Sequence, residues 1–194
     1  LPPFNKVVST PPYYLSSRLL MLLLDARFDL AVLVLQKEFA ERLTAKSGTE
    51  NYGRLTVMVR HRADVQLYET VSRHAFRPRP KVDSAIVGIT KRAPRIPVAD
   101  ESEFCELVRA LFTQRRIRLT KALRHYLDAT RPDDANDLIA SLSLPEKRVF
   151  ELETEEFEAL SNQLYAPLQS RLKSRFPGAD PKALETVEDD PRNT

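Results

Sequence analysis

Short apolar runs separated by chain breakers recur through residues 1–92 and predict alternating strands and helices. Residues 6–9 are predicted to form a short buried strand, which Pro11 and Pro12 end. A helix is predicted to start at Ser16 or Ser17, either of which can cap it, with leucines forming its apolar face up to residue 25. Residues 30–35 are apolar at every position, which is typical of a central parallel strand covered on both faces.

The elements that follow suggest how this first sheet is completed. A second helix is predicted over residues 37–45, and β-branched residues predict strands at 55–59, 65–68 and 82–90. Strand, helix, strand and helix followed by strands alone is the order of half a doubly wound α/β domain with an antiparallel finish.

The second half of the chain has a helical pattern. Residues 93–102 contain two prolines and no apolar period, so we interpret them as a linker between a domain at 1–92 and a small all-α domain at 103–166. The strongest helical pattern spans residues 103–126, and its apolar face carries Phe112, Leu119, Leu123 and Tyr126. The polar residues 167–194 are predicted to be a disordered tail.

Composition limits the kinds of protein that fit this pattern. Hydrophobic residues make up 42% of the chain and charged residues 29%, and no apolar run is long enough to span a bilayer. One cysteine cannot form an internal disulfide, and three scattered histidines give no metal-ligand spacing. These features predict a reduced, cytoplasmic protein with no membrane partner and no metal.

Charge is distributed unevenly along the chain. Residues 1–92 carry a formal charge of +7 and residues 93–194 a charge of −4, which together give the net +3. A basic surface favours a polyanion such as nucleic acid, and a solvated face without a partner explains the same charge equally well.

The sharpest local feature is Thr10, Pro11, Pro12 and Tyr13, directly after the first predicted strand. Loops beyond the carboxyl ends of strands build the ligand sites of open α/β sheets. The hydroxyl of Thr10 and the carbonyl of Pro11 could each accept a hydrogen from an aromatic amine and so turn its lone pair toward an electrophile. Tyr13 offers a ring on which a flipped base can stack. A rigid turn with half-buried tyrosines remains the alternative.

Further blocks along the chain give this loop a context. Residues 4–17 are similar to the segment that holds the Asn-Leu/Ile-Pro-Tyr signature of the KsgA/Erm ribosomal RNA adenine dimethyltransferases. Residues 35–43 resemble that family's Gln-Lys-Glu-x-Ala-x-Arg helix, and residues 52–55 its Tyr-Gly-Arg-Leu turn. Residues 76–85 resemble its Phe-x-Pro-x-Pro-Lys-Val-Asp-Ser segment, and residues 112–116 its Phe-x-x-Arg-Arg opening. The sequences of these segments are most similar to those of the archaeal-type members of the family.

The resemblance implies a fold and a role for several residues. It implies the C-terminal half of a class I, Rossmann-like methyltransferase sheet followed by the helical domain. Residues 10–13 would form the catalytic loop, with Thr10 against bound S-adenosylmethionine and the target amine. Tyr13 and Phe76 would hold the flipped adenine between their rings.

Two basic sets are candidate RNA-binding residues. Prolines impose an extended segment on residues 77–81, whose alternation is predicted to send three cations to one side. A row of cations is also predicted on the helix opposite the apolar face, and solvated faces are the alternative in both cases. The candidates are Arg77, Arg79, Lys81, Arg115, Arg116, Arg118 and Lys121.

The function that follows is S-adenosylmethionine-dependent dimethylation of adjacent adenines near the 3′ end of small-subunit ribosomal RNA during ribosome assembly. The expected partner is that RNA or a pre-ribosomal particle, and the complete enzyme is expected to be a monomer. An Erm-like resistance methylase acting on large-subunit RNA is a weaker alternative.

Two departures from the family pattern favour another reading. Thr10 stands where the family has Asn, and Pro11 where it has Leu or Ile. The four glycines form no Gly-x-Gly cluster, so this chain is expected to lack the cofactor-binding half and to be inactive alone. A non-catalytic RNA-binding assembly factor is therefore the alternative function.

Overall fold

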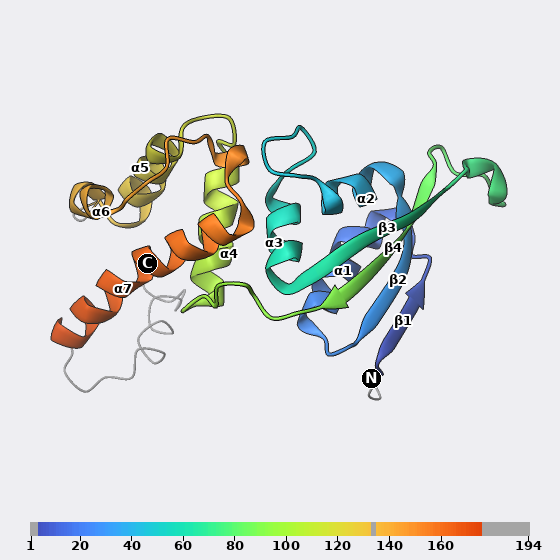
Figure 1. Ribbon diagram of the computed structural model, residues 1–194, viewed down its shortest axis with the longest axis horizontal. Coiled ribbons are helices and arrows are strands. Elements are labelled where there is room, and N and C mark those ends of the chain that lie inside the picture. The colour runs from blue at the N-terminus through green and yellow to red at the C-terminus, as the bar shows by residue number, and fades with distance from the viewer. Residues whose placement is uncertain (1–3, 133–134, 176–194) are drawn as a thin grey trace, which may run out of the picture.

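The first half of the chain forms a four-stranded mixed sheet with helices packed on it (Figure 1). The structure is a computed structural model that describes residues 4–132 and 135–175. The strands are β1 (Lys6–Ser9), β2 (Leu30–Gln36), β3 (Ala63–Val71) and β4 (Ser84–Lys91), in the spatial order β1-β2-β4-β3. The helices of this half are α1 (Ser16–Asp25), α2 (Lys37–Thr44) and α3 (Arg54–Arg62).

The strand directions confirm the predicted α/β class with an antiparallel finish. β1 pairs with β2 in parallel, whereas β4 runs antiparallel to both β2 and β3. The parallel pair needs a crossover connection, and α1 supplies it.

The two faces of the sheet differ in how well they are covered. Leu33, Val87 and their neighbours on one face are buried beneath leucines of α1 and α2. On the other face the side chain of Val8 is 83% exposed, and alternate residues of β2, such as Val32, are half-buried. The prediction that residues 30–35 are covered on both faces is therefore wrong for the residues that the structure describes.

A close contact on this second face requires a glycine. A Cβ atom at Gly88 of β4 would lie 2.4–2.7 Å from the ring and hydroxyl of Tyr68 in β3. The missing side chain thus lets the Tyr68 ring lie against the strand.

The strand predicted at residues 55–59 is wrong, because these residues belong to α3. Gly53 caps α3, and its N–H donates to the hydroxyl of Thr56 over 3.2 Å. Val59 packs in the core of the sheet half, whereas Val57 packs in the core of the helical half. Burial on both sides hides the helical period and overrides the β-propensity of valine.

The second half is a cluster of helices around its own core. Its elements are α4 (Glu101–Phe112), α5 (Leu119–Thr130), α6 (Ala135–Ser141) and α7 (Thr154–Arg175). The single helical pattern predicted over residues 103–126 is split, because Gln114 and Ile117 make turn hydrogen bonds between α4 and α5. The core also takes in Tyr52 and Val57 from the first half, so the two halves pack against each other.

The end of the predicted all-α domain contains the short α6 and the first part of α7, which is a single helix of 22 residues. This helix continues beyond Ala166 into the range predicted as tail, of which residues 176–194 lie outside the described residues. Within the part that the structure describes, no helix is long and apolar enough to cross a membrane.

A buried ionic cluster joins the two halves. The imidazole of His61 in α3 lies 2.8 Å from Glu158 Oε1 of α7 through Nδ1, and 3.0 Å from Glu101 Oε1 of α4 through Nε2. His61 and Glu158 are both 0% exposed. The second oxygen of Glu158 accepts the backbone N–H of Ile96 at 3.0 Å. Three segments distant in sequence therefore meet at one histidine.

Candidate functional site

The predicted catalytic loop and the segment that carries Phe76 meet at one edge of the sheet. β1 and β2 are parallel, so their carboxyl ends, at Ser9 and Gln36, lie at the same edge. Ser84, the first residue of β4, pairs with Gln36 on one side and with Val71, the last residue of β3, on the other. Residues 10–15 after β1 and residues 72–83 between β3 and β4 consequently leave the sheet at this edge, which we call the carboxyl edge.

The loop after β1 turns directly into a short 3₁₀ helix, η1 (Tyr13–Leu15). Pro11 is buried and Thr10 is exposed. The carbonyl of Pro12 accepts the N–H of Leu15 at 2.9 Å, which closes the turn. Among the described residues, no donor reaches the carbonyl oxygen of Pro11 or the hydroxyl of Thr10. Within this part of the chain the two oxygens therefore have no protein donor.

The two tyrosines of this loop have different surroundings. Tyr13 is half-buried, and its hydroxyl lies 2.7 Å from the Oγ of Ser84, which is 0% exposed. Tyr14 is 84% exposed. The structure thus fixes one ring at the carboxyl edge and leaves its neighbour in solvent.

Phe76 follows a second short 3₁₀ helix, η2 (Arg73–Ala75), in the connection between β3 and β4. The N–H of Arg73 donates to Asp83 Oδ1 over 2.9 Å, and the Arg73 guanidinium donates to the carbonyl of Lys81 over 3.2 Å. Phe76 is half-buried, and its N–H bonds to the carbonyl of Arg73. Tyr13 and Phe76 are not among the ring pairs in direct contact within the described residues.

The basic residues of this connection are exposed but not aligned as predicted. The backbone bends at residues 76–78 and again at 81–82, so the extended segment predicted for residues 77–81 is wrong. Alternation therefore does not place Arg77, Arg79 and Lys81 on one side. All three remain exposed in the β3–β4 connection, and Arg79 Nη2 lies 3.1 Å from His74 Nε2.

The other predicted cations lie elsewhere. α5, with Arg118 at its N-cap, is at the opposite end of the long axis from the β3–β4 connection (Figure 1). Arg116 and Lys121 are exposed there, and Arg118 pairs with Glu146 at 3.8 Å. The helical row predicted to include Arg115 is wrong at its start, because α5 begins only at Leu119.

The side chain of Arg115 contacts backbone carbonyls and an aromatic ring of the protein itself. Its guanidinium donates to the carbonyls of Glu50 and Thr49 over 3.0 and 3.2 Å and lies over the ring of Phe150 at 5.4 Å. These contacts join the turn after α4 to the loop before α3. They favour a packing role for Arg115 over a role in binding RNA.

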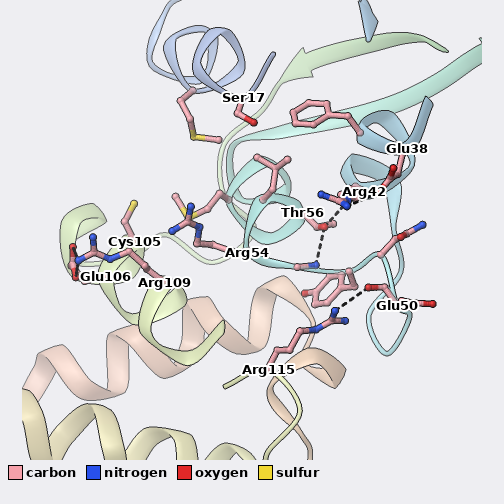
Figure 2. A pocket seen from close by; sticks show the side chains of 17 residues that line it. Ser17, Glu38, Arg42, Glu50, Arg54, Thr56, Cys105, Glu106, Arg109 and Arg115 are labelled. Carbon is pink, nitrogen blue, oxygen red and sulfur yellow. Dashed lines mark hydrogen bonds and ion pairs between the residues drawn. The ribbon is translucent and has the colours of Figure 1, made fainter. Parts of the chain in front are cut away.

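A cavity of about 890 Å³ opens between the two halves beside the carboxyl edge (Figure 2). It is lined from α1, α2, α3 and α4, and the predicted site residues 10–13 and 76–81 do not line it. Arg42 pairs with Glu38 at 2.6 Å, and Arg109 pairs with Glu106 at 2.6 Å. Arg54, Arg115 and Glu50 also line the cavity, so four arginines face three glutamates and the lining carries a formal charge of +1.

The loop next to this cavity is held by Tyr52, which is 0% exposed. Its hydroxyl donates to the carbonyl of Leu152 over 2.7 Å. Burial raises the pKa of Tyr52 well above its usual value, so the phenol stays neutral. The Tyr-Gly-Arg-Leu turn therefore serves to dock the first half on the second.

Sequence reasoning did not identify Asp83 and Ser84 as site residues. Both fall in the block at residues 76–85 that carries the family resemblance, but neither is part of a spacing that indicates chemistry. Ser84 is 71 residues from Tyr13 in the chain. Only the strand register brings the two hydroxyls together.

Comparisons with known proteins agree with this architecture. A family model described as ribosomal RNA adenine dimethylase matches residues 4–178. A relative from Thermococcus onnurineus, named a probable ribosomal RNA small subunit methyltransferase A, is 42% identical over 168 residues, which cover 84% of this chain and 61% of the relative. A relative of the same name from Halobacterium salinarum is 44% identical over 142 residues, which cover 73% of this chain and 50% of the relative.

Two solved structures are also similar to this chain. A dimethyladenosine transferase from Plasmodium falciparum superposes with a TM-score of 0.71 and 30% identity, covering 82% of this chain and 66% of that one. The 23S rRNA methyltransferase ErmE superposes with a TM-score of 0.58 and 26% identity, covering 85% of this chain and 67% of that one. The chain thus spans 50–61% of the length of the two curated relatives.

Proposed function

Because the chain belongs to the ribosomal RNA adenine dimethylase family, we propose that the full-length protein transfers methyl groups to the N6 atoms of adenines in ribosomal RNA. The family prediction made from the order of the motifs is confirmed. The proposed substrate is a pair of adjacent adenines near the 3′ end of small-subunit ribosomal RNA. The names of the curated relatives support the small subunit over the large one.

The observation that carries this proposal is the meeting of the 10–13 loop and the Phe76 segment at the carboxyl edge. In this proposal the half-buried rings of Tyr13 and Phe76 stack on an adenine that has left its helix. The exposed cations Arg77, Arg79 and Lys81 lie on the connection that carries Phe76 and would bind nearby phosphates.

The loop oxygens supply the chemistry that this chain itself contributes. The exocyclic amine of adenine is a weak nucleophile, because its lone pair is delocalised into the ring. With the base held, the Thr10 hydroxyl and the Pro11 carbonyl each accept one hydrogen of the amine and direct its lone pair out of the ring plane. These contacts orient the nucleophile without strong base catalysis.

The cofactor proposed is S-adenosylmethionine, which supplies an electrophilic methyl group on a sulfonium centre. Of the residues present, the acceptor oxygens of Thr10 and Pro11 fit the side of such a site that faces the target amine. The glycines of this chain form no phosphate- or ribose-binding turn, so the donor set here is a partial one.

A second candidate function is RNA binding without methylation, in ribosome assembly. Thr10 favours it, because a hydroxyl is shorter than the asparagine amide of the family pattern and can donate instead of accept. The half-buried, hydrogen-bonded Tyr13 favours the enzyme, because binding RNA alone does not require a fixed ring at this edge.

The test compares Tyr13→Ala with Tyr14→Ala in the full-length protein. We expect Tyr13→Ala to reduce methyl transfer to small-subunit RNA about 5- to 150-fold, since a stacking ring contributes about 1–3 kcal/mol, and to weaken RNA binding less, since the cations also bind the RNA. Tyr14→Ala removes an exposed ring from the same loop and is expected to leave transfer nearly unchanged. Equal losses of binding and transfer in Tyr13→Ala would argue for the assembly factor.

A further inference from the structure

We propose that Asp83 and Ser84 are positioning residues, which set where the rings of Tyr13 and Phe76 stand at the carboxyl edge. The inference rests on the proposed function, because it assumes that these rings hold the target adenine. Ser84 contacts the hydroxyl of Tyr13, and Asp83, the residue before it, accepts the backbone N–H of Arg73 in the turn that precedes Phe76.

Ser84 contacts the hydroxyl of Tyr13. Its side chain is fully buried, and the strand pairs at this residue with Gln36 on one side and Val71 on the other. A residue paired on both sides is among the most rigid points of a sheet. The 2.7 Å contact between the two hydroxyls therefore fixes the ring of Tyr13 relative to the sheet rather than to its own loop.

Asp83 contacts the turn that precedes Phe76. Its carboxylate accepts the N–H of Arg73 over 2.9 Å at the start of η2, and Phe76 caps the other end of that single turn. The carbonyl of Asp83 accepts the N–H of Lys37 over 3.0 Å, which ties the same residue to the start of α2. The Asp83 carboxylate thus ties the turn before Phe76 to the start of β4, in addition to the bond from the Arg73 guanidinium to the carbonyl of Lys81.

In this proposal the separation of the two rings is consequently set by two adjacent residues, Asp83 directly before β4 and Ser84 at its start. Methyl transfer depends on the reacting atoms being held at near-attack distance, so small displacements of a stacked base reduce the rate more than they reduce binding. Neither Asp83 nor Ser84 has to touch RNA for this effect.

The kinetic test uses Ser84→Ala, Tyr13→Phe and the double variant of the full-length protein. Because the single variants remove the same hydrogen bond, we expect each to lower kcat about 3- to 10-fold with KM for RNA nearly unchanged. The double variant is expected to be no slower than either single variant. The control Thr90→Ala, at the exposed far end of β4, is expected to keep kcat.

Asp83 is tested with Asp83→Ala and its conservative partner Asp83→Asn. The asparagine oxygen can still accept the N–H of Arg73, so Asp83→Asn is expected to retain most of kcat. Asp83→Ala removes this acceptor and is expected to lower kcat about 3- to 10-fold. In a Phe76→Ala background, Asp83→Ala is expected to have no further effect, since the ring it positions is gone.

A readout independent of transfer separates the two proposals. Fluorotyrosine at position 13 gives a ¹⁹F resonance that reports the surroundings of the ring, and we expect Ser84→Ala to shift it while Thr90→Ala does not. If the wild-type protein transfers no methyl group, the proposed function is wrong, and the ¹⁹F resonance still tests the contact between Ser84 and Tyr13. If Ser84→Ala leaves both the resonance and kcat unchanged, or if its effect adds to that of Tyr13→Phe, the positioning role is wrong.

Discussion

Because Glu158 lies in the buried cluster between the two halves, we expect Glu158→Ala to lower the free energy of unfolding strongly. Glu158 is fully buried, its Oε1 lies 2.8 Å from His61 Nδ1, and its Oε2 accepts the N–H of Ile96 at 3.0 Å. Removing one partner of a buried, hydrogen-bonded pair costs about 3–5 kcal/mol. His61 keeps its second contact, with Glu101 at 3.0 Å, so we expect a loss at the lower end, about 3 kcal/mol.

The assay is urea unfolding of the full-length protein, followed by circular dichroism. With a typical dependence of about 1–3 kcal/mol per molar urea, the midpoint should fall by about 1–3 M. The control is Glu155→Ala on the same helix, whose ion pair with the 66% exposed Arg95 should contribute no more than about 1 kcal/mol.

A double variant tests the reasoning itself. Because His61 and Glu158 share one bond, removing both should cost at least about 1 kcal/mol less than the sum of the single losses. A loss in Glu158→Ala no larger than in the control, or strictly additive losses, would refute the claim that this cluster joins the halves.

Two further predictions concern stability. Burial raises the pKa of Glu101, but hydrogen bonds from Arg62 and His61 outweigh it and hold the pKa below its usual value. The stability that Glu101 contributes is therefore present above its unfolded pKa of about 4.3 and is lost as the pH falls through the lower folded value. Urea unfolding between about pH 3 and 7 should show a shallower acid loss in Glu101→Gln, and an unchanged slope would contradict this. Tyr52→Phe leaves the buried carbonyl of Leu152 without its donor and should cost about 1–3 kcal/mol by the same assay, whereas Tyr14→Phe, at an exposed ring, should cost almost nothing.

Much of the fold could be predicted from the sequence, because apolar pattern and breakers agree in most segments. The elements at residues 6–9, 30–36 and 37–44 were predicted within a residue or two, and the parallel start with an antiparallel finish is confirmed. The apolar pattern gave a wrong prediction where a helix is buried on two sides. In α3 the valines Val57 and Val59 point into different cores, so no one-sided helical stripe remains.

The candidate site was predicted in part. Local chemistry predicts the oxygens of Thr10 and Pro11 as acceptors, because they lie within four consecutive residues after a strand. The tethers at Asp83 and Ser84 depend on strand register across the sheet, which no local pattern encodes. Arg115 was predicted as an RNA contact because a charged row is visible in sequence, whereas its bonds to backbone carbonyls are not.

The central claim is that the full-length protein methylates adenine. The most direct measurement is mass spectrometry of unmethylated small-subunit RNA, or of the corresponding subunit particle, after incubation with the protein and S-adenosylmethionine. The account predicts N6,N6-dimethyladenine at two adjacent positions near the 3′ end, with the yield greatly reduced in Tyr13→Ala. RNA that is bound tightly yet carries no added methyl group would contradict it and leave the assembly factor.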